Sequence, residues 1–176
     1  SMAVTPWLVD KSPSFAQFMS PEASPNIESF NNVSAHHQLL TDHVLIFGYG
    51  RVGQSVSRLL QTEAIPFVAI DSDPLRVQES QNAGEPVYFG DVKQKDILRI
   101  VGIARAKMVL ITFDQHDQAI SVIHLIKSLY PDIPVVVRTR KDYRMDELLK
   151  AGASQVVPEI LEGSLMLVTQ VLQMSG

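Results

Sequence analysis

The chain has 176 residues, of which 45% are hydrophobic and 19% charged, and its formal net charge is −4. This length supports one domain with a buried core and is too short for two full-sized domains. The acidic balance argues against broad nucleic-acid binding through a basic face. The lack of cysteine excludes a disulfide scaffold, a thiolate metal site and a cysteine nucleophile.

The composition of the chain changes near residue 42. Residues 1–42 contain four prolines among many Ser, Asn and His residues and show no helical or strand period. We interpret them as a linker or N-terminal arm, followed by one folded domain over residues 43–176. The initial Ser-Met resembles a cloning remnant, which favours a piece of a larger protein over a small protein with a processed start. The adjacent His36 and His37 are interpreted as part of the solvated linker rather than as metal ligands.

From residue 43 onward, short apolar runs alternate with segments of helical period. The predicted strands cover residues 43–47, 66–71, 86–89, 107–113, 134–138 and 155–157. The predicted helices cover residues 51–63, 74–83, 93–101, 116–129, 142–151 and about 160–173. Strands that are apolar on both faces are typical of a buried parallel sheet. The predicted fold class is therefore α/β: a Rossmann-like, doubly wound, parallel six-stranded sheet with helices on both faces.

A glycine-rich turn directly follows the first predicted strand and opens the first helix. Residues 48–53 read Gly-Tyr-Gly-Arg-Val-Gly, which matches the G-x-G-x-x-G pattern. Gly48 permits the tight turn, Gly50 lets a pyrophosphate approach the backbone, and Gly53 lets the helix pack closely on the sheet. Free N–H groups and a partial positive charge at the start of a helix attract phosphate. We predict a nucleotide-binding loop formed by Gly48, Tyr49, Gly50, Arg51, Val52 and Gly53.

An acidic residue stands where a ribose would lie. Asp71 ends the second predicted strand, 18 residues after Gly53. A carboxylate at this place accepts hydrogen bonds from ribose hydroxyls. It also disfavours a 2′-phosphate, because two like charges about 4 Å apart at an effective dielectric constant of about 20 repel by about 4 kcal/mol. The pattern predicts NAD or an adenosine nucleotide rather than NADP. The alternative is a Rossmann fold that binds no nucleotide and keeps its glycines for packing.

Further contacts are expected at the carboxyl ends of the strands, where α/β proteins bind ligands. The expected residues are Ser72, Asp73, Arg76, Gly90, Asp91, Val92, Thr112 and Phe113. Two alternatives stay open: Asp91 could be the N-cap of the next helix, and Arg76 could cover its own helix instead of an adenine. Arg51 could meet either a phosphate or an anion from a neighbouring molecule.

Sequence patterns of catalysis are missing. No Tyr is followed four residues later by Lys, and no Walker A pattern occurs. We interpret His116, between Asp114 and Asp117, as part of a polar loop that caps the next helix rather than as an acid–base cluster. No metal site and no enzymatic activity are expected. The alternatives are a fragment of an NAD-dependent oxidoreductase and a methyltransferase.

Five segments together resemble a known family over roughly three quarters of the chain. They are HVLIFGYGRVGQ, IPFVAIDSDPLRV, PVYFGDVKQKDIL, MVLITFDQHDQAI and AGASQVVPE. The chain resembles the regulator-of-potassium-conductance domain, also called the potassium-transport nucleotide-binding or TrkA N-terminal domain. Within that group it is most similar to the domain of Kef-type potassium/proton antiporters, including those of plant plastids.

The resemblance implies a cytosolic gating domain that senses AMP, NAD(H), ATP or ADP and regulates potassium/proton antiport. It implies a homodimer and, as a partner, the membrane transporter domain of the same protein, with no nucleic acid. It places the domain on the cytoplasmic face of an inner or plastid-type membrane. In glutathione-gated members an arginine after the fifth strand helps to bind a second effector, and Arg138 or Arg140 would be that residue here. Arg140 is followed by Lys141 where those members have Asp, which argues against glutathione sensing.

Overall fold

A computed structural model of the chain describes residues 40–140 and 142–175, without the side chains of residues 160–166 and 175. Almost all of the predicted arm 1–42, with His36 and His37, lies outside these residues. Within the described part, none of the helices is both long enough and apolar enough to cross a bilayer.

The described residues form one parallel sheet with the strand order β3-β2-β1-β4-β5-β6. The strands are β1 (Val44–Phe47), β2 (Phe67–Asp71), β3 (Val87–Phe89), β4 (Met108–Ile111), β5 (Val135–Thr139) and β6 (Gln155–Pro158). The order reverses between β1 and β4. The predicted doubly wound Rossmann-like sheet is confirmed, and the reversal is the place where such sheets bind ligands.

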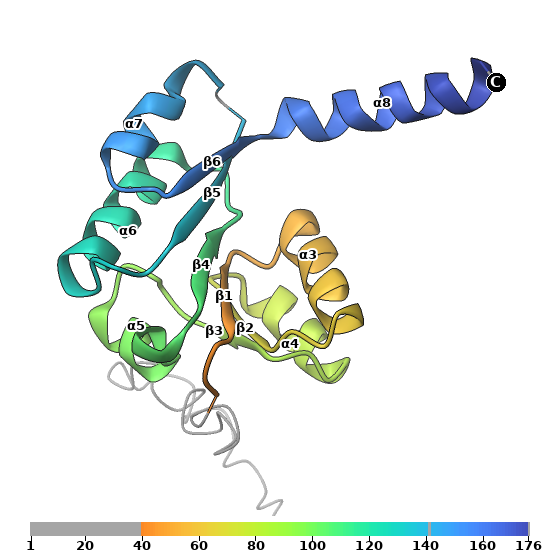
Figure 1. Ribbon diagram of the computed structural model, residues 1–176. Coiled ribbons are helices and arrows are strands. Elements are labelled where there is room, and N and C mark those ends of the chain that lie inside the picture. The colour runs from red at the N-terminus through yellow and green to blue at the C-terminus, as the bar shows by residue number, and fades with distance from the viewer. Residues whose placement is uncertain (1–39, 141, 176) are drawn as a thin grey trace, which may run out of the picture.

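Helices cover both faces of the sheet (Figure 1). They are α3 (Arg51–Thr62), α4 (Pro74–Asn82), α5 (Lys95–Ile100), α6 (His116–Leu129), α7 (Met145–Lys150) and α8 (Glu159–Ser175), with 3₁₀ turns η1 (Ile103–Arg105) and η2 (Asp142–Arg144). Helices α3 and α4 lie on one face, and α5, α6 and α7 on the other. Helix α8 leaves the carboxyl end of β6 and extends away from the sheet.

Five strands begin one residue later than predicted, and at three of them, β2, β3 and β5, the displaced residue is a proline. Pro66, Pro86 and Pro134 have no N–H to donate to a neighbouring strand. Their carbonyl oxygens still accept hydrogen bonds, from the N–H groups of Val44, Ala69 and Val109. The ladder thus starts at the next residue. The helix predicted over residues 142–151 is also shorter, because its first three residues form η2.

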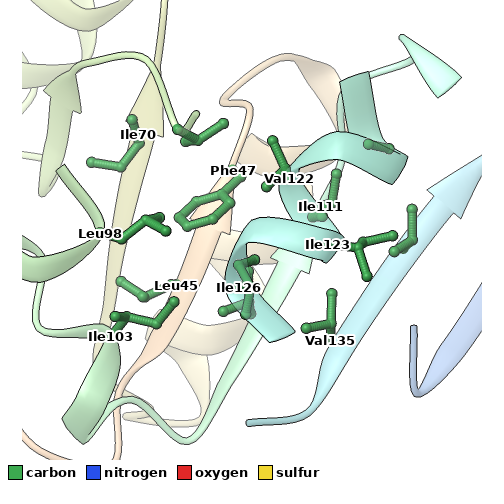
Figure 2. Packing of buried hydrophobic residues seen from close by; sticks show 14 of the residues in the cluster. Leu45, Phe47, Ile70, Leu98, Ile103, Ile111, Val122, Ile123, Ile126 and Val135 are labelled. Atoms are coloured by element: carbon green, nitrogen blue, oxygen red, sulfur yellow. The ribbon is translucent and has the colours of Figure 1, made fainter. Parts of the chain in front are cut away.

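Alternate residues of each central strand face opposite sides of the sheet. On the α5–α6 side, Leu45 and Phe47 pack with Ile70, Leu98 and the apolar face of α6 (Figure 2). On the α3–α4 side, a smaller cluster is formed by residues including Val44, Ile46, Ala69 and Val87. Phe47 is fully buried, one residue before the glycine-rich turn. Packing of the core therefore fixes the position of that turn.

Replacing Phe47 with Ala tests this packing. We expect Phe47→Ala to lower the free energy of unfolding by about 3–5 kcal/mol, because it leaves a cavity in the larger cluster. Urea unfolding followed by circular dichroism measures the change. Leu75→Ala is the control, since Leu75 is exposed on α4, and an equal loss in the two variants would contradict the assignment of Phe47 to the core.

Candidate nucleotide-binding site

A crevice of about 800 Å³ lies at the carboxyl ends of the central strands. It is lined by the glycine-rich turn and the start of α3, by residues that follow β2 and β4, and by the end of β5 and the first residue of α8. A smaller hollow of about 160 Å³ lies beside it, and Gly48, Asp71, Arg76 and Phe113 line both. The crevice thus spans the reversal of strand order, at the carboxyl ends of the strands where a ligand was predicted.

The glycine-rich turn has a specific steric reason for two of its glycines. Gly48 has φ +97°, and a Cβ there would lie 2.8 Å from the Thr112 hydroxyl oxygen. A Cβ on Gly53 would overlap the carbonyl oxygen of Gly48. A Cβ on Gly50 would meet nothing within 4 Å, so the space beside Gly50 is open to the crevice. No side chain caps the start of α3 within the described residues, which leaves its first turn suited to an anion.

Asp71 forms part of the crevice wall, and its carboxylate already has several donors. Its side chain is 5% exposed. One oxygen accepts a hydrogen bond from the Tyr49 N–H and the other from the Asp73 N–H. Arg76 Nη1 lies 2.9 Å from both oxygens. Asp71 therefore ties the turn to the start of α4, and a ribose would have to share it with Arg76 or displace Arg76.

The Arg76 side chain reaches the crevice from α4, and its contact with an adenine stays a prediction. Its guanidinium pairs with Asp71 and, at 3.2 Å, with Asp73. It lines both the crevice and the smaller hollow. This placement neutralises the carboxylate that was expected to repel a 2′-phosphate.

Two of the predicted binding residues turn their side chains away from the crevice. The Tyr49 hydroxyl lies 2.8 Å from Ser57 Oγ and donates to Glu85 at 3.3 Å, and burial raises the pKa of this phenol. The Asp73 carboxylate caps α4 by accepting the N–H of Leu75 at 3.0 Å. Near Asp71 both residues therefore act through their backbone N–H groups.

The other predicted residues divide between the two spaces. Arg51, Val52, Thr112 and Phe113 line the crevice, whereas Ser72, Gly90, Asp91 and Val92 line the hollow beside it. The alternative role of Asp91 as a helix N-cap is wrong. Its carboxylate accepts the N–H of Lys93 at 3.0 Å, while the residue that precedes α5 is Gln94.

The opposite wall of the crevice holds a network of ion pairs that the sequence reasoning missed in part. Arg138 donates to Asp114 at 2.6 Å and pairs with Glu159 at 2.7 Å. Arg140 pairs with the same two carboxylates, at 3.2 and 2.7 Å. Both arginines were predicted as a possible second site, but their ion pairs with Asp114 and Glu159 were not predicted. Each carboxylate follows a strand of the sheet, and that position was the available signal.

The charge of Glu159 is stabilised by this network. Desolvation acts to raise the pKa of Glu159, but the hydrogen bond from Arg140 and the charges of Arg138 and Arg140 leave it below its ordinary value. Glu159 is therefore ionised at neutral pH and forms ion pairs with the guanidinium groups of both Arg138 and Arg140.

His116 does not form an acid–base cluster with its neighbours. It is buried in the first turn of α6, with Nε2 3.3 Å from a Glu147 oxygen. Asp114 turns to Arg138, and Asp117 turns to Arg144 at 3.2 Å. The predicted capping role is also wrong, because no side chain caps α6 in the structure. In the described part of the chain, no three His, Asp or Glu side chains could hold a metal ion together.

The contact between Glu147 and Arg144 predicts a pH dependence of stability. The hydrogen bond from Arg144 lowers the pKa of Glu147 to about 2, from 4.5. A carboxyl with a lowered pKa in the folded state stabilises the fold above its unfolded pKa, and this contribution is lost as the pH falls through the folded value. We expect Glu147→Gln to lower the melting temperature at pH 7, with a difference from the wild type that disappears between pH 4.5 and about 2. A difference that stays constant over this range would contradict the ion pair.

Comparisons with known proteins show the family of the chain. The model of the TrkA-N domain family matches residues 44–159. A protein of Alkalimonas amylolytica, provisionally named K(+) efflux antiporter KefB, is 37% identical over 87% of this chain and 23% of its own length. K(+) efflux antiporter 1, chloroplastic, of Arabidopsis thaliana is 36% identical over 98% of this chain and 14% of its own length.

A solved structure shows the same fold with a nucleotide. The Kef C-terminal domain of Shewanella denitrificans in its AMP-bound form is 28% identical, with a TM-score of 0.64, and the match covers 76% of this chain and 81% of that chain. The chain spans less than a quarter of the length of the two antiporters named above. With its Rossmann-like sheet, its glycine-rich turn and a family match over residues 44–159, the chain belongs to the TrkA-N domain family.

Proposed function

We propose that this chain is the nucleotide-sensing regulatory domain of a potassium/proton antiporter and that it has no catalytic activity of its own. Its partner is the membrane transporter domain of the same protein, and it works on the cytoplasmic face of that membrane. The names of the two antiporter relatives support the parent protein. The AMP-bound relative supports an adenosine nucleotide as the ligand, with NAD(H), ADP and ATP in the same chemical class.

The observation that carries the proposal is the pairing of an open phosphate site with a ribose acceptor. The start of α3 is uncapped beside Gly50, and Asp71 lines the same crevice. A phosphate on the first turn of α3 leaves the attached ribose on the Asp71 side, over β2, and the adenine towards the hollow beside Gly90 and Asp91. This arrangement uses most of the predicted site residues at once.

Regulation follows from differential binding. A nucleotide that binds one arrangement of the domain more tightly than another shifts the population toward that arrangement. A complete switch from 1:99 to 99:1 needs about 5.5 kcal/mol of difference, and weaker modulation needs less. The oxidoreductase alternative has no support from the site, because His116 does not line the crevice and faces Glu147.

A homodimer is the second part of the proposal. The large apolar side chains Leu167, Val168, Leu172 and Met174 on α8 are all exposed, Leu172 at 67%. Isolated exposed apolar residues are common, but a series of them along one helix marks an interaction site. We assign this face of α8 to contact with a second copy of the chain.

Binding of AMP and 2′-deoxy-AMP tests the ribose contact. We expect the wild-type chain to bind AMP about tenfold or more tightly than 2′-deoxy-AMP, because the deoxy analogue loses a hydrogen bond to a charged acceptor. In Asp71→Asn this preference should fall toward one, because the charge of the acceptor is removed. Isothermal titration calorimetry measures both ratios.

A matched control separates the local effect from the change in net charge. Asp96→Asn removes the same charge on α5, where Asp96 pairs with Arg99 and neither residue lines the crevice. It should retain the wild-type preference for AMP. The absence of any heat of binding with AMP, ADP, ATP and NADH at millimolar concentration would overturn the proposed function.

The dimer has a separate test. We expect light scattering to give twice the monomer mass for the wild-type chain and the monomer mass for Leu172→Asp, because a charge in an apolar contact is costly to bury. Leu75→Asp, on the exposed face of α4, is the control and should leave the mass unchanged. A monomeric wild-type chain at high micromolar concentration would contradict the assignment.

A further inference from the structure

The crevice has two chemically different walls. The side of β1 and β2 carries the glycine-rich turn and Asp71, which account for one phosphate and its ribose. The side of β4, β5 and β6 carries Arg138, Arg140, Asp114 and Glu159, and all four line the same crevice. A nucleoside monophosphate bound in this way would make no use of the second wall.

The second wall lies next to the phosphate site. Arg138 Nη1 donates to the carbonyl oxygen of Thr112 at 3.3 Å, and the Thr112 hydroxyl donates to the carbonyl oxygen of Gly48 at 2.6 Å. One residue therefore separates the guanidinium from the glycine-rich turn. A ligand that extends past its first phosphate, across the reversal of strand order, reaches Arg138 and Arg140 next.

Arg138 is held firmly, yet its hydrogen-bonding capacity is not filled. Its side chain is only 8% exposed, and its Nε is buried without a hydrogen-bond partner in the described structure. Arg140 is half exposed. Their two carboxylate partners are each more than a third exposed. Glu159 is the first residue of α8, so a change in this network reaches the start of that helix.

We propose that Arg138 and Arg140 form a subsite for the second phosphate of a nucleoside diphosphate and that Glu159 occupies this subsite until that phosphate displaces it. The inference rests on the proposed nucleotide-binding function. A phosphate can accept the guanidinium N–H groups in the same way as the carboxylate does. Displacing Glu159 releases the first residue of α8, so ADP would loosen the start of this helix, whereas AMP would leave it in place.

The ratio of ADP affinity to AMP affinity tests the subsite in the full 176-residue chain. Calorimetry with both nucleotides should show this ratio rising on the order of tenfold in Glu159→Gln, because the competing charge is gone. The ratio should fall by a similar factor in Arg140→Gln, because one guanidinium is lost. Asp96→Asn is the control for net charge and should keep the wild-type ratio, since Asp96 is exposed on α5 and outside the crevice.

Hydrogen exchange on the wild-type chain gives an independent readout that needs no variant. Backbone amides at the start of α8 should exchange faster with saturating ADP than with saturating AMP. Unchanged affinity ratios in both variants, or equal exchange with the two nucleotides, would overturn the subsite while AMP binding leaves the proposed function standing. Failure of the wild-type chain to bind either nucleotide would overturn both.

Discussion

The carboxylate of Asp71 is the point on which the candidate site depends. It accepts the N–H of Tyr49 in the glycine-rich turn and the N–H of Asp73 at the start of α4, and it pairs with Arg76. These charge-assisted bonds fix the glycine-rich turn. The fixed turn holds the Gly48 carbonyl oxygen against Gly53, where a Cβ on residue 53 would overlap it. The same group that is expected to hold a ribose therefore also shapes the crevice in advance, which lowers the entropic cost of ordering the site when a ligand binds.

Most of the fold could be predicted because its signals are local. Apolar runs separated by segments of helical period predict a parallel sheet with crossover helices, and that prediction was confirmed. Three of the errors at strand starts came from Pro66, Pro86 and Pro134, which are apolar but cannot donate to the ladder. An apolar run alone does not show which residue is the first to pair by hydrogen bonds with the neighbouring strand.

The candidate site could be predicted only on the side where its residues are close in sequence. Gly48–Gly53 and Asp71 form one βαβ unit, so their spacing carries the geometry. The network of Arg138 and Glu159 joins the end of β5 to the start of α8, and Asp114 comes from the end of β4. Which carboxylate meets which guanidinium depends on how three strands are staggered. The direction of the Tyr49 ring was hidden for the same reason, since Ser57 and Glu85 set it from other elements.

Helix α8 connects the crevice to a distant point of the molecule. Its 17 residues make it about 25 Å long, and its first residue belongs to the crevice wall while the rest extends away from the sheet. A rotation of about 10° at its base moves its far end by roughly 4 Å, as a lever of this length requires. The chain enters the domain at the amino ends of the central strands, opposite the crevice, where Arg105 donates to the carbonyl oxygen of Leu40. A small displacement of Glu159 by a bound phosphate would thus produce a larger displacement at the far end of α8.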